Sequence, residues 1–104
     1  MSFLQIDYDK AIAQAKELES AAEQCGRSLN DLRDARGASE AYWVGVSGNA
    51  MRLQIEAAES DLSYARDQLI SIAASIRRVA DELKRADETV KGAIESFRDF
   101  KFFI

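Results

Sequence analysis

The side chains that most often perform catalysis are scarce in this sequence. It contains no His and a single Cys, Cys25, so the usual general bases and most transition-metal ligands are missing. Carboxylates are plentiful, but Glu56 and Glu59 are typical of them in belonging to predicted helix surfaces, where solubility and ion pairing are their ordinary roles. Gly45-X-X-Gly48 lacks the Lys and the preceding strand of a phosphate-binding loop. We therefore expect no enzymatic activity, no metal and no cofactor.

Cys25 has no second Cys to pair with, so an intrachain disulfide is excluded. It falls on the apolar stripe of the first predicted helix, where a Cys usually packs as a small hydrophobic side chain. The alternatives are an intermolecular disulfide and a reactive thiol.

Trp43, the only Trp of the chain, lies where a connecting loop is expected, and Gly45 follows two residues later. Loops are normally polar and exposed, so a Trp there either braces the connection or meets a partner. The Gly permits a left-handed or tightly turned backbone beside this bulky side chain. The surrounding residues 41–49 are also too apolar for a simple solvated loop.

An apolar stripe at helical spacing predicts a first helix over about residues 7–37. Asp7, or Ser2 together with Gln5, is expected to cap its start, and Gly37 to end it. The stripe consists of Tyr8, Ile12, Ala15, Leu18, Ala22, Cys25, Leu29 and Leu32.

A second and more regular stripe predicts a helix over about residues 49–92, in which apolar residues alternate at steps of 4 and 3. Ser47 or Asn49 is expected to cap its start, and Gly92 is the first weak point, followed by an aromatic tail over 93–104. The stripe consists of Met51, Ile55, Ala58, Leu62, Ala65, Leu69, Ile72, Ile76, Val79, Leu83, Ala86 and Val90.

Two stripes, a turn at residues 38–48 and no strand pattern predict an all-α fold, an antiparallel two-helix hairpin in one domain over 1–104. Residue 8 should lie opposite a position near 80, which leaves the end of the second helix uncovered. The expected solution is a second hairpin, giving a four-helix bundle. The side chains expected in the hairpin and dimer core are Leu18, Cys25, Leu29, Leu32, Ile55, Leu62, Leu69, Ile72, Ile76 and Val79.

The charge and hydropathy of the chain limit the classes of partner that we expect it to bind. The net charge of −4 comes from interspersed residues with no basic stripe, which gives nucleic-acid binding little support. No segment approaches the roughly 18 to 20 consecutive apolar residues of a membrane span. Residues 1–7 lack the basic start and apolar run of a conventional secretory signal peptide.

With these features the chain resembles the WXG-hundred (Esx, ESAT-like) family. The resemblance covers about residues 6–88 and rests on a length near one hundred, two amphipathic helices and a Trp-X-Gly turn between them. Trp43, Gly45, Ala50 and Leu53 match the family pattern. It implies a cytoplasmic protein exported without a cleavable signal peptide by a type VII secretion system. It also implies a homodimer or a heterodimer with another WXG protein or an LXG-type toxin, and contact with the secretion ATPase.

The second half of the family's export signal, a Tyr-X-X-X-Asp/Glu motif near the end of helix two, is altered here. Leu83 stands in the place of the Tyr, while Asp87 supplies the acidic residue. Phe97 and Phe100, with Phe102 and Phe103, form an aromatic cluster that either docks a partner or caps the end of the bundle.

Three alternatives stay open for function. The chain is a secreted substrate, a targeting partner or chaperone for an LXG-type toxin, or a cytoplasmic helical scaffold unrelated to secretion. In the last case Trp43 serves only to stabilise the turn between the two helices.

Overall fold

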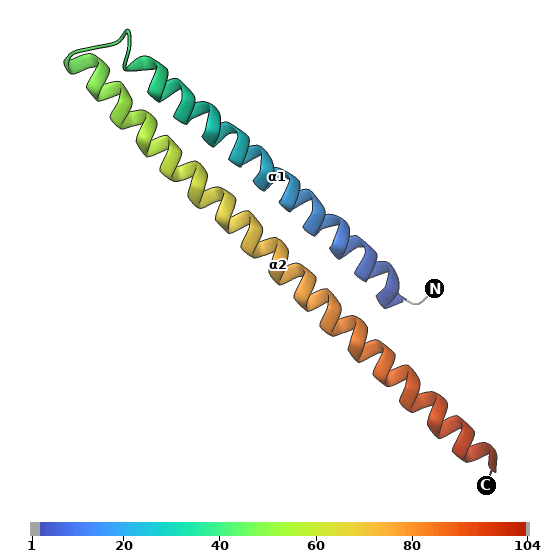
Figure 1. The fold of residues 1–104 in the computed structure, drawn as a ribbon. Coiled ribbons are helices and arrows are strands. Elements are labelled where there is room, and N and C mark those ends of the chain that lie inside the picture. Colours follow the sequence, from blue (N-terminus) through green and yellow to red (C-terminus); the bar gives the residue numbers. More distant parts are fainter. Residues whose placement is uncertain (1–2, 104) are drawn as a thin grey trace. The chain divides into compact units, whose positions relative to one another are not determined.

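The computed structural model describes residues 3–103, and the side chains of residues 7–101. It consists of helix α1 (Phe3–Ser39), a connection over residues 40–45 and helix α2 (Val46–Phe103), with no strand among the described residues (Figure 1). This confirms the all-α helical hairpin. The contacts divide the chain into two compact units, Glu17–Ile72 and Met1–Lys16 with Ala73–Ile104, which we call the turn unit and the open-end unit.

The turn unit has a core of aliphatic side chains from both helices. Leu29 and Ala22 of α1 are the most buried, at 1% and 3% exposure. The other expected core residues of this unit are half-buried, with the exception of Ile72, which is 48% exposed. The half-buried residues are Leu18, Cys25, Leu32, Ile55, Leu62 and Leu69.

Alanines hold the open-end unit together. Among the side chains of this unit that the structure describes, the buried ones are Ala15 of α1 and Ala73 and Ala80 of α2, at 0 to 5% exposure. Tyr8 donates a hydrogen bond from its hydroxyl to Asp81 Oδ1 at 3.2 Å, and Lys84 Nζ lies 4.6 Å from the centre of the Tyr8 ring. Residue 8 therefore lies opposite residue 81, close to the position expected from the sequence.

Within the open-end unit, α2 turns a different face toward α1 than the apolar periodicity suggested. Ala73 and Ala80 face α1, whereas Val79 and Leu83 are 49% and 53% exposed. Small alanine side chains permit close helix approach, while the larger branched side chains on the adjacent face remain in solvent. Five of the twelve residues of the predicted stripe are thus exposed, namely Ile72, Val79, Leu83, Ala86 and Val90.

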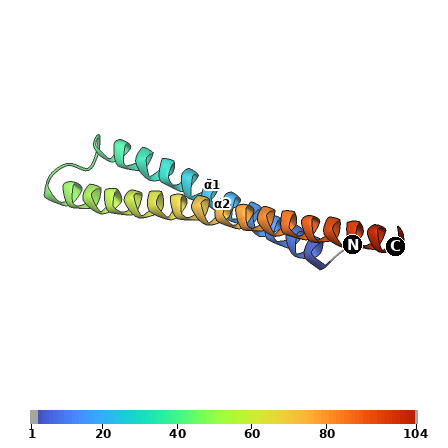
Figure 2. The same cartoon turned by 90° about the horizontal axis from the view of Figure 1, so that it is seen from below.

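Both helices extend beyond the boundaries expected from the sequence. α1 continues through Gly37 to Ser39, and α2 continues through Gly92 to Phe103, so that residues 93–103 are helical rather than a separate tail. A Gly costs only about 1 kcal/mol in a helix interior, which good helix formers on either side can offset. Figures 1 and 2 both show α2 of the open-end unit continuing beyond the first residues of α1.

The helix caps also differ from expectation. Asp7 lies inside α1, and Ser47 and Asn49 lie inside the first turn of α2, so none of the three caps a helix. Gly45 precedes α2 directly, and its carbonyl accepts the first bond of the helix, from the amide of Asn49 at 3.0 Å. Ser2 lies outside the described residues.

Among the described residues, neither helix has a window apolar enough to cross a bilayer. Charged side chains recur along the whole of both helices.

Replacing Gly37 and Gly45 by Ala should have opposite effects on stability. Gly37 is helical and Gly45 has φ of 91°, while a Cβ at either position would meet nothing within 4 Å. Gly37→Ala should raise the free energy of unfolding by about 0.5 to 1 kcal/mol, and Gly45→Ala should lower it by about 1 to 2 kcal/mol. Urea denaturation followed by circular dichroism measures both. Equal effects would contradict the positive φ at residue 45.

Candidate functional site at the Trp43 turn

Helix α1 ends in a tightened turn that leads directly to Trp43. The amides of Glu40, Ala41 and Tyr42 donate to carbonyls three residues earlier at 3.2 to 3.3 Å. The Trp43 amide donates to the Ser39 carbonyl at 2.8 Å, and the buried Ser39 hydroxyl donates to the Arg36 carbonyl at 2.7 Å. These bonds satisfy carbonyls that the helix end would otherwise leave unpaired.

Gly45 reverses the chain before α2 begins at Val46. Its φ of 91° lies in the left-handed region, and no non-Gly residue of the described chain has a positive φ. This is the conformation that the sequence suggested for the Gly of the Trp-X-Gly turn. A side chain here would be strained even though space is available.

Trp43 packs onto Gly48 in the first turn of α2. Gly48 is buried, and a Cβ built there would overlap the Trp43 carbonyl oxygen and come within 3.2 Å of the indole Cδ1. Within the chain, the closest approach to Trp43 therefore occurs at Gly48, where only Gly fits. Trp43 nevertheless remains 37% exposed.

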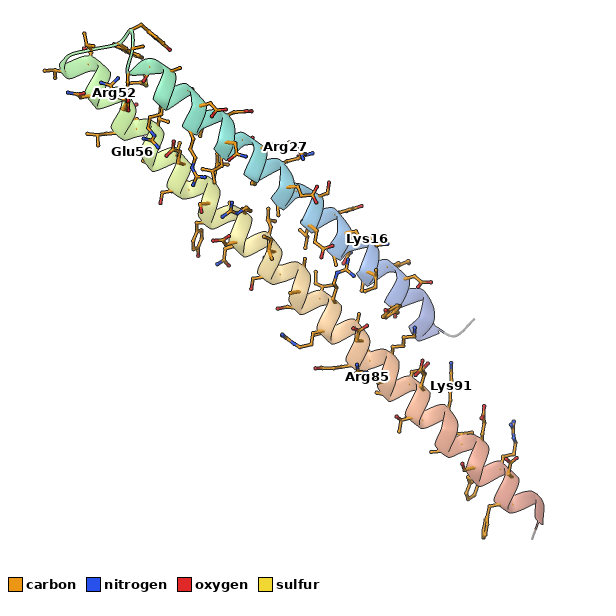
Figure 3. All side chains as sticks on the ribbon, in the orientation of Figure 1. Lys16, Arg27, Arg52, Glu56, Arg85 and Lys91 are labelled. Carbon is orange, nitrogen blue, oxygen red and sulfur yellow. The ribbon has the colours of Figure 1, made fainter. Side chains whose placement is uncertain are left out.

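Arg52 ties the connection to α2. Its Nη1 donates to the Trp43 carbonyl at 2.7 Å and reaches Ser39 O at 3.5 Å and Ser39 Oγ at 3.4 Å. Its Nη2 donates to Asn49 Oδ1 at 2.8 Å. Figure 3 shows Arg52 at the turn end of α2. One guanidinium thus donates hydrogen bonds to the end of α1, to the turn and to the start of α2. Its several N–H donors, fixed in one plane, permit this.

The turn presents apolar side chains to solvent on either side of Trp43. Tyr42, Val44 and Val46 are 74%, 76% and 87% exposed. Among the described residues, none forms a hydrogen bond with the Tyr42 side chain. A loop held this firmly does not need three exposed apolar side chains for its own structure, so they form a candidate contact surface, which we call the turn patch.

An ion pair next to the turn links the two helices. Arg36 Nε donates to Glu59 Oε1 at 2.9 Å, and Arg36 Nη1 lies 3.7 Å from Glu56 Oε1. The hydrogen bond from Arg36 to Glu59, with the charge of that carboxylate, raises the pKa of Arg36 above its ordinary value. The Glu59 side chain is only 11% exposed, against 53% for Glu56. The pair fixes the register of α2 against α1.

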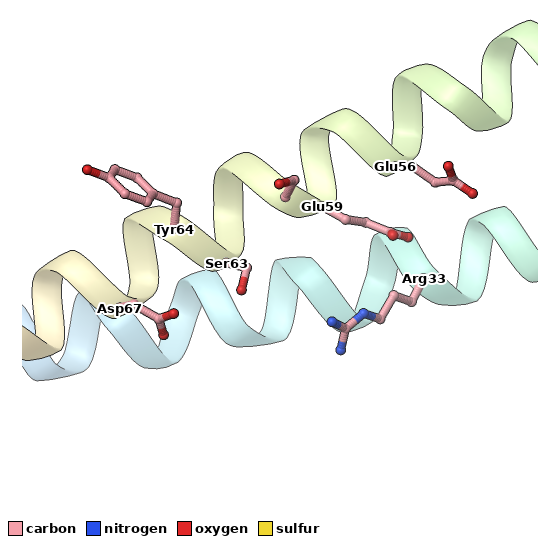
Figure 4. Close-up of a pocket in the computed structure, with 7 residues that line it drawn as sticks. Arg33, Glu56, Glu59, Ser63, Tyr64 and Asp67 are labelled. Atoms are coloured by element: carbon pink, nitrogen blue, oxygen red, sulfur yellow. The ribbon is translucent and has the colours of Figure 1, made fainter.

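A shallow, open depression of about 490 Å³ lies beside this pair, lined by Arg33, Glu56, Glu59, Ser60, Ser63, Tyr64 and Asp67. In Figure 4, Arg33 comes from α1 and the other labelled residues from α2, with Tyr64 pointing away from α1. No group of three or more His, Cys, Asp and Glu residues among the described side chains is placed to hold a metal ion. The side chains that line the depression are mostly charged or polar.

The other expected site residues belong to the open-end unit. Leu83, Phe97 and Phe100 are 53%, 66% and 63% exposed. Asp87 forms an ion pair with Lys91 Nζ at 3.1 Å. Trp43 and Gly45 belong to the turn unit. The side chains of Phe102 and Phe103 lie outside the described residues.

Ser39, Gly48 and Arg52 are parts of the site that sequence reasoning missed. The sequence contained one usable signal, a second Gly directly before the predicted helix and only five residues after the bulky Trp43. Nothing in the sequence distinguished Arg52 from the other helix-surface arginines.

Comparisons with known proteins do not place the chain in a family. No protein-family model matches it, and no curated protein or solved structure is significantly similar to it.

Gly48→Ala should displace Trp43, since the new Cβ overlaps the Trp43 carbonyl. Trp43 is the only Trp, so its fluorescence reports the turn directly. We expect a red-shifted emission and faster acrylamide quenching than in the unaltered protein. Gly92→Ala, where nothing lies within 4 Å, should leave both unchanged. Identical spectra for Gly48→Ala and the unaltered protein would contradict the described packing.

Glu59→Ala should destabilise the hairpin far more than Glu56→Ala. The first removes the nearly buried partner of Arg36 at 2.9 Å, and the second removes an exposed carboxylate at 3.7 Å. We expect the free energy of unfolding to fall by about 1 to 3 kcal/mol for Glu59→Ala and by less than about 0.5 kcal/mol for Glu56→Ala. Thermal denaturation of the two variants compares them, and equal losses would show that the pair is not fixed in solution.

Proposed function

We propose that this chain is a non-enzymatic helical-hairpin protein of a type VII (Esx) secretion system. It acts by pairing with a second helical hairpin, into an assembly of four helices, two from each chain. The observation that carries the pairing is the exposed apolar face of α2. Val79, Leu83, Val90, Phe97 and Phe100 are 49 to 66% exposed on one helix. Such a face on a soluble helix is typical of a contact surface.

The turn supports the assignment to the WXG type of hairpin. Gly45 at φ 91° and the packing of Trp43 against the start of α2 give the Trp-X-Gly sequence a defined structural role. The turn patch of Tyr42, Val44 and Val46 then offers a surface to the secretion machinery or to the partner. The resemblance supplies the secretion route, since nothing in the geometry alone names one.

Two versions of the proposal differ in the role of this chain. As a secreted substrate it leaves the cell in its own right, while as a targeting partner it accompanies an LXG-type toxin. Leu83 in place of the motif Tyr favours the second version, because the partner then supplies the aromatic half of the export signal. A cytoplasmic scaffold unrelated to secretion remains the alternative.

Val44→Asp is the sharpest test of the turn patch. The Val44 side chain is 76% exposed, so a charge there should leave the hairpin's thermal stability unchanged. We expect secretion of the chain, or recovery of its partner on purification, to fall at least about tenfold, as for a charge placed in a contact surface. The measurements are immunoblots of culture supernatants and co-purification with the products of neighbouring genes.

Ile70→Asp provides the matched control, because Ile70 is exposed in the same unit but is not part of the turn patch. It should leave secretion and partner recovery unchanged. Secretion and recovery that survive Val44→Asp would favour the scaffold alternative. Within the proposal, stronger export of Leu83→Tyr would show that the family motif is being read.

A further inference from the structure

The turn patch lies on a connection that is anchored to α1 at one end and to α2 at the other. The backbone amides as far as that of Trp43 donate to carbonyls of α1, and the Gly45 carbonyl accepts from the Asn49 amide of α2. Among the described residues, the hydrogen bond that joins Trp43 to α2 comes from the Arg52 side chain, at 2.7 Å. Val44 lies between the two anchors, so its position depends on both of them.

Arg52 is itself oriented by a second hydrogen bond. Its Nη2 donates to Asn49 Oδ1 at 2.8 Å, on the preceding turn of α2, while its Nη1 donates to the Trp43 carbonyl. The two nitrogens lie in one rigid plane, so the bond to Asn49 aims the other nitrogen at the connection. A Lys ammonium is a point donor on a flexible stem and cannot reproduce this pair of bonds at a fixed spacing.

The same guanidinium lies against the fixed end of α1. Its Nη1 is 3.5 Å from the Ser39 carbonyl oxygen and 3.4 Å from Ser39 Oγ, and Ser39 is only 4% exposed. The Ser39 hydroxyl donates to the Arg36 carbonyl, and the Arg36 side chain pairs with Glu59 of α2 at 2.9 Å. Arg52 therefore holds Trp43 in place relative to both helices.

We propose that Arg52 is a positioning residue for the turn patch, which it holds in one arrangement through the Trp43 carbonyl before any partner binds. This inference rests on the proposed function, in which the turn patch is a contact surface, and it names the residue that sets the shape of that surface. A loop that is already ordered loses less conformational entropy on binding, so the contacts that it makes contribute more to affinity.

Loss of the bond from Arg52 should loosen the turn without unfolding the hairpin. Trp43 keeps its packing on Gly48. The most buried side chains of the turn unit, Leu29 and Ala22, lie on α1 well before the turn. A change at Arg52 therefore separates the shape of the turn patch from the stability of the helices.

Arg52→Lys, measured on the purified full chain, tests whether Arg52 fixes the turn. We expect the amides of Tyr42 and Trp43 to exchange hydrogen at least about tenfold faster than in the unaltered protein, because the connection opens locally. Acrylamide should also quench the Trp43 fluorescence more efficiently. Exchange in the middle of both helices and the midpoint of thermal denaturation should stay the same, because the buried core is unchanged.

Arg66→Lys is the matched control. Arg66 is also a half-buried residue of α2 in the turn unit, but its described hydrogen bonds go to Ser63 and Asp67 of its own helix. It should leave exchange and quenching at the turn unchanged. Asn49→Ala keeps the guanidinium but removes its Oδ1 partner, so it should also loosen the turn, though less than Arg52→Lys.

Export tests whether the fixed arrangement matters for recognition. We expect the amount of secreted chain on immunoblots, or of partner recovered with it, to fall about three- to tenfold for Arg52→Lys, the size of the ordering cost of one side chain. Arg66→Lys should cause no loss. Reduced secretion with an unchanged turn in the free chain would show that Arg52 contacts the partner directly and would overturn its positioning role. A loosened turn with full secretion and partner recovery would overturn the proposal as well.

Failure of this inference is distinguishable from failure of the proposed function. If Val44→Asp leaves secretion and partner recovery unchanged, the turn patch is not a contact surface and the proposed function is wrong, while exchange in the free chain still decides whether Arg52 fixes the turn. If Val44→Asp lowers both and Arg52→Lys alters neither the turn nor secretion, the proposed function stands and Arg52 has no positioning role.

Discussion

Each helix of a two-helix hairpin has a single neighbour, and here the neighbour of α2 is the shorter helix. α1 has 37 residues and α2 has 58, so α1 can cover neither the full length of α2 nor more than one of its faces. In the open-end unit the covered face consists of alanines, which bring the helices close but bury little apolar area. The larger side chains lie on the adjacent face. This division leaves a row of large apolar side chains on α2 that α1 does not cover, and this is the face for which we propose a second hairpin.

The turn solves a different problem, which is to reverse the chain without losing the hydrogen bonds of two helix ends. Ser39, Arg52 and the carbonyl of Gly45 satisfy these groups, and Gly45 and Gly48 supply the conformation and the space that no other residue could. The ion pair between Arg36 and Glu59 then fixes the register next to the turn. The turn unit thus has a hydrogen-bonded connection and an ion pair between the helices, and in the open-end unit Tyr8 of α1 contacts Asp81 and Lys84 of α2.

The sequence predicted the hairpin, the position opposite residue 8 and the left-handed Gly45, because each follows from periodicity or from a property of one residue type. It did not predict which face of α2 meets α1, since two neighbouring stripes of α2 both have helical spacing. One passes through Ala73 and Ala80, and the other passes through Val79 and Leu83. Packing at close distance selects the alanines, and this depends on the other helix. α2 extends past Gly92 because the helix formers around this residue offset the cost of a single Gly. Arg52 could not be found, as its role depends on carbonyls brought together only in the fold.

The position of Trp43 bears on how a Trp-X-Gly turn can serve as a recognition signal. Its carbonyl is bonded by Arg52 and its indole covers Gly48, so the side chain is part of the turn's own structure before any partner arrives. Its 37% exposure leaves one part of the ring accessible, while Tyr42 and Val44 on either side are exposed almost throughout. Removal of Trp43 would therefore disturb structure and recognition together. The neighbouring exposed residues isolate recognition, and for this reason a surface built around Trp43 must be examined through Val44 rather than through Trp43 itself.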